Sequence, residues 1–187
     1  MPKDETWSTD KLNQKDVLLV TAKVGTILVR VFLSIGMAAI GIVGAVTVIN
    51  GGVPPEGMQI VVEGAKTNEV TGAVLLILVI TMASLALAYD FTTRLAQIID
   101  TVGEGDPFTE ANAKRLTRMG WTAIAIELIA IPAGLLSVWL EPQLKDGTFS
   151  IDSDFSLTGI GLALVLFILA RVFRKGTEMR EDLEGTV

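Results

Sequence analysis

Long apolar segments alternate with short polar ones along the whole chain. Each apolar segment is long enough to cross a bilayer as a helix, which takes about 20 residues. The segments are residues 24–49, 70–92, 120–140 and 155–173. Leu, Ile, Val, Ala and Gly fill them, as is typical of packed transmembrane helices. The pattern predicts an all-α integral membrane protein with four transmembrane helices.

The first apolar segment also carries small residues at helical spacing, which favour close approach of a second helix. They are Ser34, Ala38, Gly41 and Ala45. We expect them either to let another helix approach closely or to be present only because Gly and Ala are common in spans.

The polar stretch between the second and third spans is the most structured of the connections. An apolar stripe continues past the second span, so that helix is expected to project as an amphipathic helix as far as Gly103. Thr109 then has the position of an N-cap, with Phe108 before it as half of a hydrophobic staple. We therefore treat 1–187 as a single four-helix transmembrane domain with a hairpin at 91–119 and a charged tail at 174–187.

The two other connections, after the first and third spans, are rich in Gly, Pro and acidic residues. Each contains a short β-prone run, at residues 58–62 and 148–152. We predict small loops outside the membrane in which these runs pair as a sheet.

The basic residues are distributed very unevenly between the two sides of these spans. Only Lys66 and Lys145 fall on the side of the two loops, and the other basic residues fall on the side of the hairpin and the termini. By the positive-inside rule, both termini and the hairpin are in the cytoplasm.

The composition removes several function classes. The chain has no Cys and no His, so the common nucleophile–base pairs and transition-metal ligands are missing. Its net charge of −6 argues against direct binding of nucleic acid. We expect a protein that is not an enzyme and holds no cofactor and no metal.

Four ionisable residues lie in or at the edge of the spans: Arg30, Asp90, Glu127 and Arg171. Counted from the outer ends of the spans, Arg30 and Asp90 lie about 30 Å down and Glu127 and Arg171 about 20 Å down. Since an unpaired charge in hydrocarbon is costly, we predict ion pairs between Glu127 and Arg171 and between Arg30 and Asp90. These residues either form a proton or ion pathway or only set the register of the helices.

Two runs of sequence carry a resemblance to a known family. They are GEGDPFTEANAKRLTRMGW, beginning at Gly103, and LARVFRKGTEMREDLEGTV, ending at Val187. Both resemble signature regions of DUF2975, a family of small four-helix bacterial membrane proteins without an assigned function. The matching positions are Gly105, Pro107, Phe108, Asn112, Ala113, Arg115, Leu116 and Gly120 in the first run, and Phe173, Gly176, Asp182, Thr186 and Val187 in the second. The resemblance implies a bacterial inner membrane protein and, because family members are often encoded beside one, a helix-turn-helix transcription regulator as partner.

Two hypotheses for the function, from different classes of membrane protein, are compatible with the sequence. The first is a sensor or sequestering partner that binds the cytoplasmic regulator through the hairpin, with Asp106, Pro107, Phe108, Asn112, Arg115 and Arg118 as the partner-binding residues. The alternative is a small transporter or proton-linked carrier that uses the Glu127/Arg171 pair. Both place the chain in a lipid bilayer, and both leave open whether it forms a homo-oligomer.

Overall fold

The computed structural model describes residues 6–50, 67–140 and 157–184, and it is all helical there apart from the turn between the second and third helices. The helices are α1 (Thr6–Ile49), α2 (Thr67–Gly103), α3 (Glu110–Leu140) and α4 (Leu157–Glu184). All four are long and apolar enough to cross a membrane, which confirms the predicted class of four-span helical membrane protein. The predicted short strands at 58–62 and 148–152 lie outside the described residues.

The helices extend further than the apolar segments alone. α2 continues to Gly103, as its apolar stripe predicted. α1 begins at Thr6, ahead of the first apolar segment, and α4 ends at Glu184, so most of the charged tail is helical. Lys, Arg, Glu and Met are good helix formers. In the tail, an i,i+3 ion pair between Lys175 and Glu178 adds to this preference.

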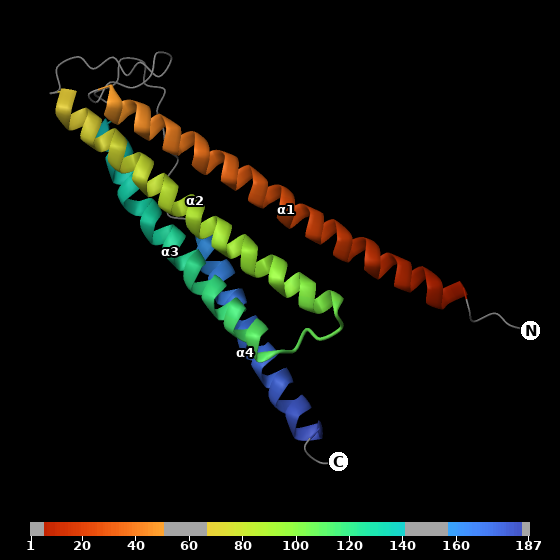
Figure 1. The fold of residues 1–187 in the computed structure, drawn as a ribbon. Helices are drawn as coiled ribbons and strands as arrows, with labels where there is room; N and C mark the ends of the chain where they lie inside the picture. The colour runs from red at the N-terminus through yellow and green to blue at the C-terminus, as the bar shows by residue number, and fades with distance from the viewer. Residues whose placement is uncertain (1–5, 51–66, 141–156, 185–187) are drawn as a thin grey trace, which may run out of the picture.

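The helices pack in chain order, as Figure 1 shows: α1 against α2, α2 against α3, and α3 against α4. Within the described ranges no other pair of helices makes backbone contact. The expected bundle is therefore an open row, in which α1 is packed on α2 alone. Consecutive helices run in opposite directions, so the start of α1, the turn between α2 and α3, and the end of α4 lie at the same end of the molecule (Figure 1). We call this the hairpin end.

Two apolar clusters join α2, α3 and α4. The cluster nearer the hairpin end joins three helices through Ile98, Leu116, Met119, Leu166 and Ala170, with Phe91 and Phe173 packed against it. The cluster at the opposite end joins α2 and α3 through Val70, Ala73, Ile77 and Leu140. Neither cluster contains a residue of α1.

α1 reaches α2 through a face that differs from the predicted small-residue stripe. Gly36, Gly41 and Gly44 face α2, because a Cβ atom on each would stand 3.6 to 3.9 Å from an α2 side chain. Gly41 belongs to the predicted stripe, but Ser34, Ala38 and Ala45 are exposed. Gly36 and Gly44, which the predicted stripe left out, therefore also contribute to the contact with α2.

α3 and α4 are staggered along their axes. Glu127 of α3 lies level with Gly159 of α4, and Gly120 lies level with Phe167. α3 continues to Leu140. At the helical rise per residue, it therefore extends about 15 Å beyond the level of the first described residue of α4. Because of this offset, every residue of α4 lies closer to the hairpin end than its depth counted from the sequence indicated.

Candidate functional site

The turn between α2 and α3 (residues 104–109) closes the second helix with a Schellman motif. The Asp106 amide donates to the Thr101 carbonyl at 3.1 Å, and the Gly105 amide donates to the Val102 carbonyl at 3.1 Å. Gly105 has a positive φ of 85°. Glycine adopts this left-handed conformation without strain. The glycine-rich sequence here therefore serves a sharp helix stop.

α3 begins with the predicted N-cap. The Thr109 hydroxyl accepts a hydrogen bond from the Asn112 amide at 3.2 Å, which confirms the cap. The Thr109 amide in turn donates to the Pro107 carbonyl at 3.1 Å. The turn thus supplies hydrogen-bond partners to the ends of both helices.

Asn112 is the centre of the turn and is fully buried. Its side-chain amide donates to Thr101 Oγ1 at 2.7 Å and to the Pro107 carbonyl at 2.9 Å. Its oxygen accepts from Arg115 Nη1 at 2.7 Å, and Arg115 Nε donates to Gln97 Oε1 at 3.0 Å. A buried amide needs all such partners, so this network fixes the angle between α2 and α3.

α4 packs against the same turn. The Phe108 ring lies on the Phe173 ring with centroids 5.2 Å apart, and it also contacts Gly176 so closely that a Cβ atom there would stand 2.7 Å from the ring. Arg180 donates a hydrogen bond to the Asp106 carboxylate. The turn and the last turns of α4 therefore form one unit, which we call the hairpin platform (residues 97–116 and 170–180).

The predicted partner-binding residues divide into two groups on this platform. Asn112 and Arg115 point into the network of the turn, Asp106 is paired with Arg180, and the Pro107 carbonyl accepts from Asn112. Phe108 packs on α4, although 43% of it remains exposed. Arg118 is exposed. Most of these residues thus have an internal structural role that the sequence pattern did not reveal.

The predicted ion pair between Glu127 and Arg171 does not form in the structure. The Glu127 carboxyl group lies against Gly159. Arg171 is about 18 Å further along α4, counted at the helical rise per residue. The depth of Arg171 was wrong because the count assumed that the C-terminal end of α3 and the N-terminal end of α4 are level with each other. This removes the contact on which the transport alternative depended.

The predicted pair of Arg30 and Asp90 is also replaced by other contacts. Asp90 accepts two hydrogen bonds from Arg94 on its own helix, at 2.7 and 2.8 Å. Arg30 instead lies over the Tyr89 ring, 5.4 Å from its centroid, and donates to the Tyr89 hydroxyl at 3.4 Å. The first of these contacts is a cation–π interaction. Because Arg94 is four residues from Asp90, it satisfies the carboxylate without crossing to another helix.

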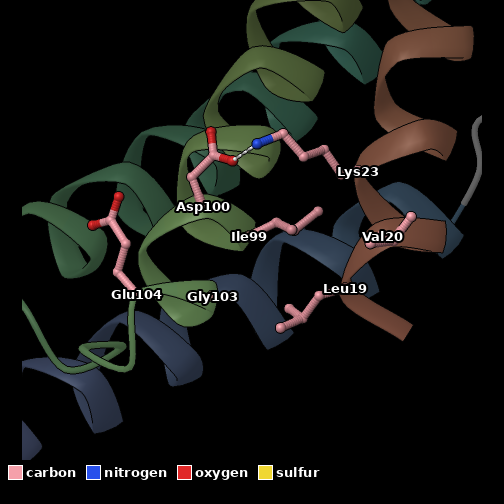
Figure 2. A pocket seen from close by; sticks show the side chains of 7 residues that line it. All are labelled: Leu19, Val20, Lys23, Ile99, Asp100, Gly103 and Glu104. Atoms are coloured by element: carbon pink, nitrogen blue, oxygen red, sulfur yellow. Dashed lines mark hydrogen bonds and ion pairs between the residues drawn. The ribbon is translucent and has the colours of Figure 1, made fainter. Parts of the chain in front are cut away.

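A groove between α1 and α2 lies beside the platform, and the sequence pattern did not indicate it. Figure 2 shows it: Lys23 of α1 reaches across to Asp100 of α2, and Nζ stands 2.7 Å from Oδ1. The groove has a volume of about 530 Å³. Its remaining lining residues are Leu19, Val20, Ile99, Gly103 and Glu104. It therefore combines an exposed ion pair with apolar walls.

Comparison of the sequence with protein-family models shows which family the chain belongs to. Residues 58–187 match the family described as "Protein of unknown function (DUF2975)". The chain belongs to the DUF2975 family. No curated protein matches this DUF2975 chain, and no solved structure does. In this DUF2975 protein the two signature runs meet in space, since Phe108 packs on Phe173 and Gly176. The resemblance seen in the sequence is therefore confirmed, and the residues of the two runs that lie between 105 and 116 and between 173 and 176 belong to the hairpin platform.

Proposed function

We propose that this DUF2975 protein is a non-enzymatic protein of the bacterial inner membrane that binds a cytoplasmic helix-turn-helix regulator at its hairpin end. The proposal places the hairpin platform and the α1–α2 groove on the cytoplasmic side, as the distribution of basic residues predicts. The implied role is that of a sensor or sequestering partner.

The α1–α2 groove is the observation that carries the proposal. The side chains of Lys23 and Asp100 remain 59% and 46% exposed in their ion pair, so a partner can reach both charges. Leu19, Val20 and Ile99 supply apolar contact beside them. An amphipathic helix binds well to a groove of this composition.

The platform beside the groove supports the same function. Among the described residues, its buried polar side chains are already satisfied, so a partner would meet a preformed surface. Preorganisation lowers the entropy cost of association. The internal role of Asn112 and Arg115 moves the expected contact surface from these residues to the groove and to the exposed part of Phe108.

A two-hybrid assay between the full-length protein and a helix-turn-helix regulator whose gene neighbours its own tests the proposal. We expect Lys23→Glu and Asp100→Lys each to weaken binding about tenfold, since each places a like charge in the groove. The double exchange Lys23→Glu with Asp100→Lys restores the ion pair with reversed polarity. We expect this double variant to bind the regulator as weakly as the single variants do, because the partner must match the positive charge at position 23 and the negative charge at position 100.

Lys145→Glu is the matched control, because it reverses a lysine in the connection after the third span, which the proposed topology puts on the opposite side of the membrane from the groove. Membrane fractionation confirms insertion of every variant. Equal regulator binding by the wild type and all groove variants would contradict the proposal.

A further inference from the structure

We propose that α3 and α4 together bind the phosphate of an anionic phospholipid at the hairpin end of the membrane. The site consists of two stripes that meet at the Trp121 and Phe167 rings: Lys114, Arg118 and Trp121 on α3, and Phe167, Arg171 and Arg174 on α4. It depends on the placement of the helices in a bilayer and is independent of the regulator.

The stripes are evenly spaced along their helices. Each set follows a spacing of four and three residues, so its three members share one face of their helix. The stripes meet where the Trp121 and Phe167 rings pack edge to face with centroids 5.4 Å apart. Because α3 and α4 are antiparallel, the basic residues of both stripes follow these aromatic rings toward the hairpin end.

The arginines of the stripes differ from the other basic residues whose side chains the structure describes. Lys23, Arg30, Arg94, Lys114, Arg115, Lys175 and Arg180 each have a protein partner. Arg118, Arg171 and Arg174 are exposed, and among the described residues none of their guanidinium groups forms an ion pair or hydrogen bond. Glu110 lies within electrostatic reach of Arg174, but its carboxylate is held by Lys114 at 2.7 Å. In the described part of the chain, the unpaired guanidinium groups are therefore concentrated on this pair of helices.

The stripes also lie at the level of the membrane interface. Trp121 is 63% exposed although it is large and apolar. Since the third apolar segment begins at residue 120, Trp121 has the position of an aromatic residue at the headgroup boundary. The stagger of α4 places Arg171 level with Leu116, on the hairpin side of Trp121. Arg118 is one turn from Trp121 in the same direction.

A phospholipid fits this arrangement better than a soluble anion does. Guanidinium groups bind phosphate with paired, charge-assisted hydrogen bonds. On the other side of the aromatic rings, α4 exposes Leu164, Val165 and Leu162. Acyl chains can lie along these side chains while the phosphate reaches the arginines. Basic residues between helices at this level are typical of anionic headgroup sites.

Native mass spectrometry of the full-length protein with phosphatidylglycerol and phosphatidylcholine tests the inference. We expect the wild type to retain phosphatidylglycerol in preference to phosphatidylcholine. Each Arg→Gln change at positions 118, 171 and 174 should reduce the phosphatidylglycerol affinity about fivefold, and Arg171→Gln with Arg174→Gln roughly 30-fold.

Lys23→Gln with Lys175→Gln is the matched control, because it removes the same charge from exposed sites outside the stripes. We expect it to keep the phosphatidylglycerol preference. Thermal unfolding in a zwitterionic detergent shows whether each variant is folded, and single Arg171→Gln serves if the double variant is not.

Four results would overturn the inference. One is a wild type that binds both lipids equally, and another is an equal loss of affinity in the control and stripe variants. The third is competition by soluble glycerol phosphate at the concentration of the lipid, which would identify a site for a free phosphate. Loss of regulator binding alone, with lipid binding intact, would instead assign the arginines to a protein partner and overturn the lipid site.

Discussion

Gly159 of α4 lies directly against the carboxyl group of Glu127 of α3. A Cβ atom at this glycine would overlap the carboxylate and stand 2.6 Å from Glu127 Cγ. Glu127 is therefore accommodated by the absence of a side chain at Gly159, and not by an ion pair with a basic residue.

The first prediction concerns this contact. Gly159→Ala should displace the Glu127 side chain and destabilise the protein by about 1–3 kcal/mol, the usual cost of overpacking. Gly161→Ala is the control, since nothing lies within 4 Å of a Cβ atom there, and it should be neutral or slightly stabilising. Thermal unfolding in detergent measures both. Removing the side chain with Glu127→Ala should recover most of the Gly159→Ala loss, and purely additive losses would show that the two positions do not touch.

The second prediction concerns the buried amide of the turn. Asn112→Leu keeps the approximate size of the side chain but removes its donors and its acceptor, so the Arg115 guanidinium loses a partner. We expect a loss of about 1–3 kcal/mol and faster hydrogen exchange across residues 103–109. Asn50→Leu is the matched control because Asn50 is exposed. Unchanged exchange at the turn in Asn112→Leu would show that the network does not hold it.

The third prediction distinguishes the observed ion pair from the one expected from the sequence. A double-mutant cycle between Asp90 and Arg94, whose side chains are partly buried, should give a coupling free energy of about 0.5–1 kcal/mol, at or above the upper part of the range for pairs within a helix. The cycle between Asp90 and Arg30 should give none, because Arg30 contacts Tyr89. A larger coupling for Asp90 with Arg30, measured by thermal unfolding, would contradict the structure.

The fourth prediction concerns topology. If all four helices cross the membrane, their alternating directions put both termini and the turn on one side. Reporter fusions after Gly105 and after Val187 should therefore both report a cytoplasmic location, and a fusion after Asn50 should report the opposite side. Opposite locations for Gly105 and Val187 would mean that α3 and α4 do not both span.

The sequence alone determined the features that depend on local pattern. The apolar segments predicted the four helices, the stripe beyond residue 91 predicted the length of α2, and Thr109 predicted the start of α3. These depend on helical periodicity and capping, which involve residues within a few positions of one another. The family resemblance also depended only on sequence runs, and the match over residues 58–187 confirms it.

The tertiary structure decided which residues meet across helices. Counting along each span could not give the axial offset of α3 and α4, because that offset depends on packing of Gly120 against Phe167 and of Gly159 against Glu127. The offset separates Glu127 from Arg171, and it brings Phe108 to Phe173 and Asp106 to Arg180. Two charged residues at equal distances from the outer ends of their spans need not meet, since a shift of one helical turn moves every side chain about 5 Å along the neighbouring helix.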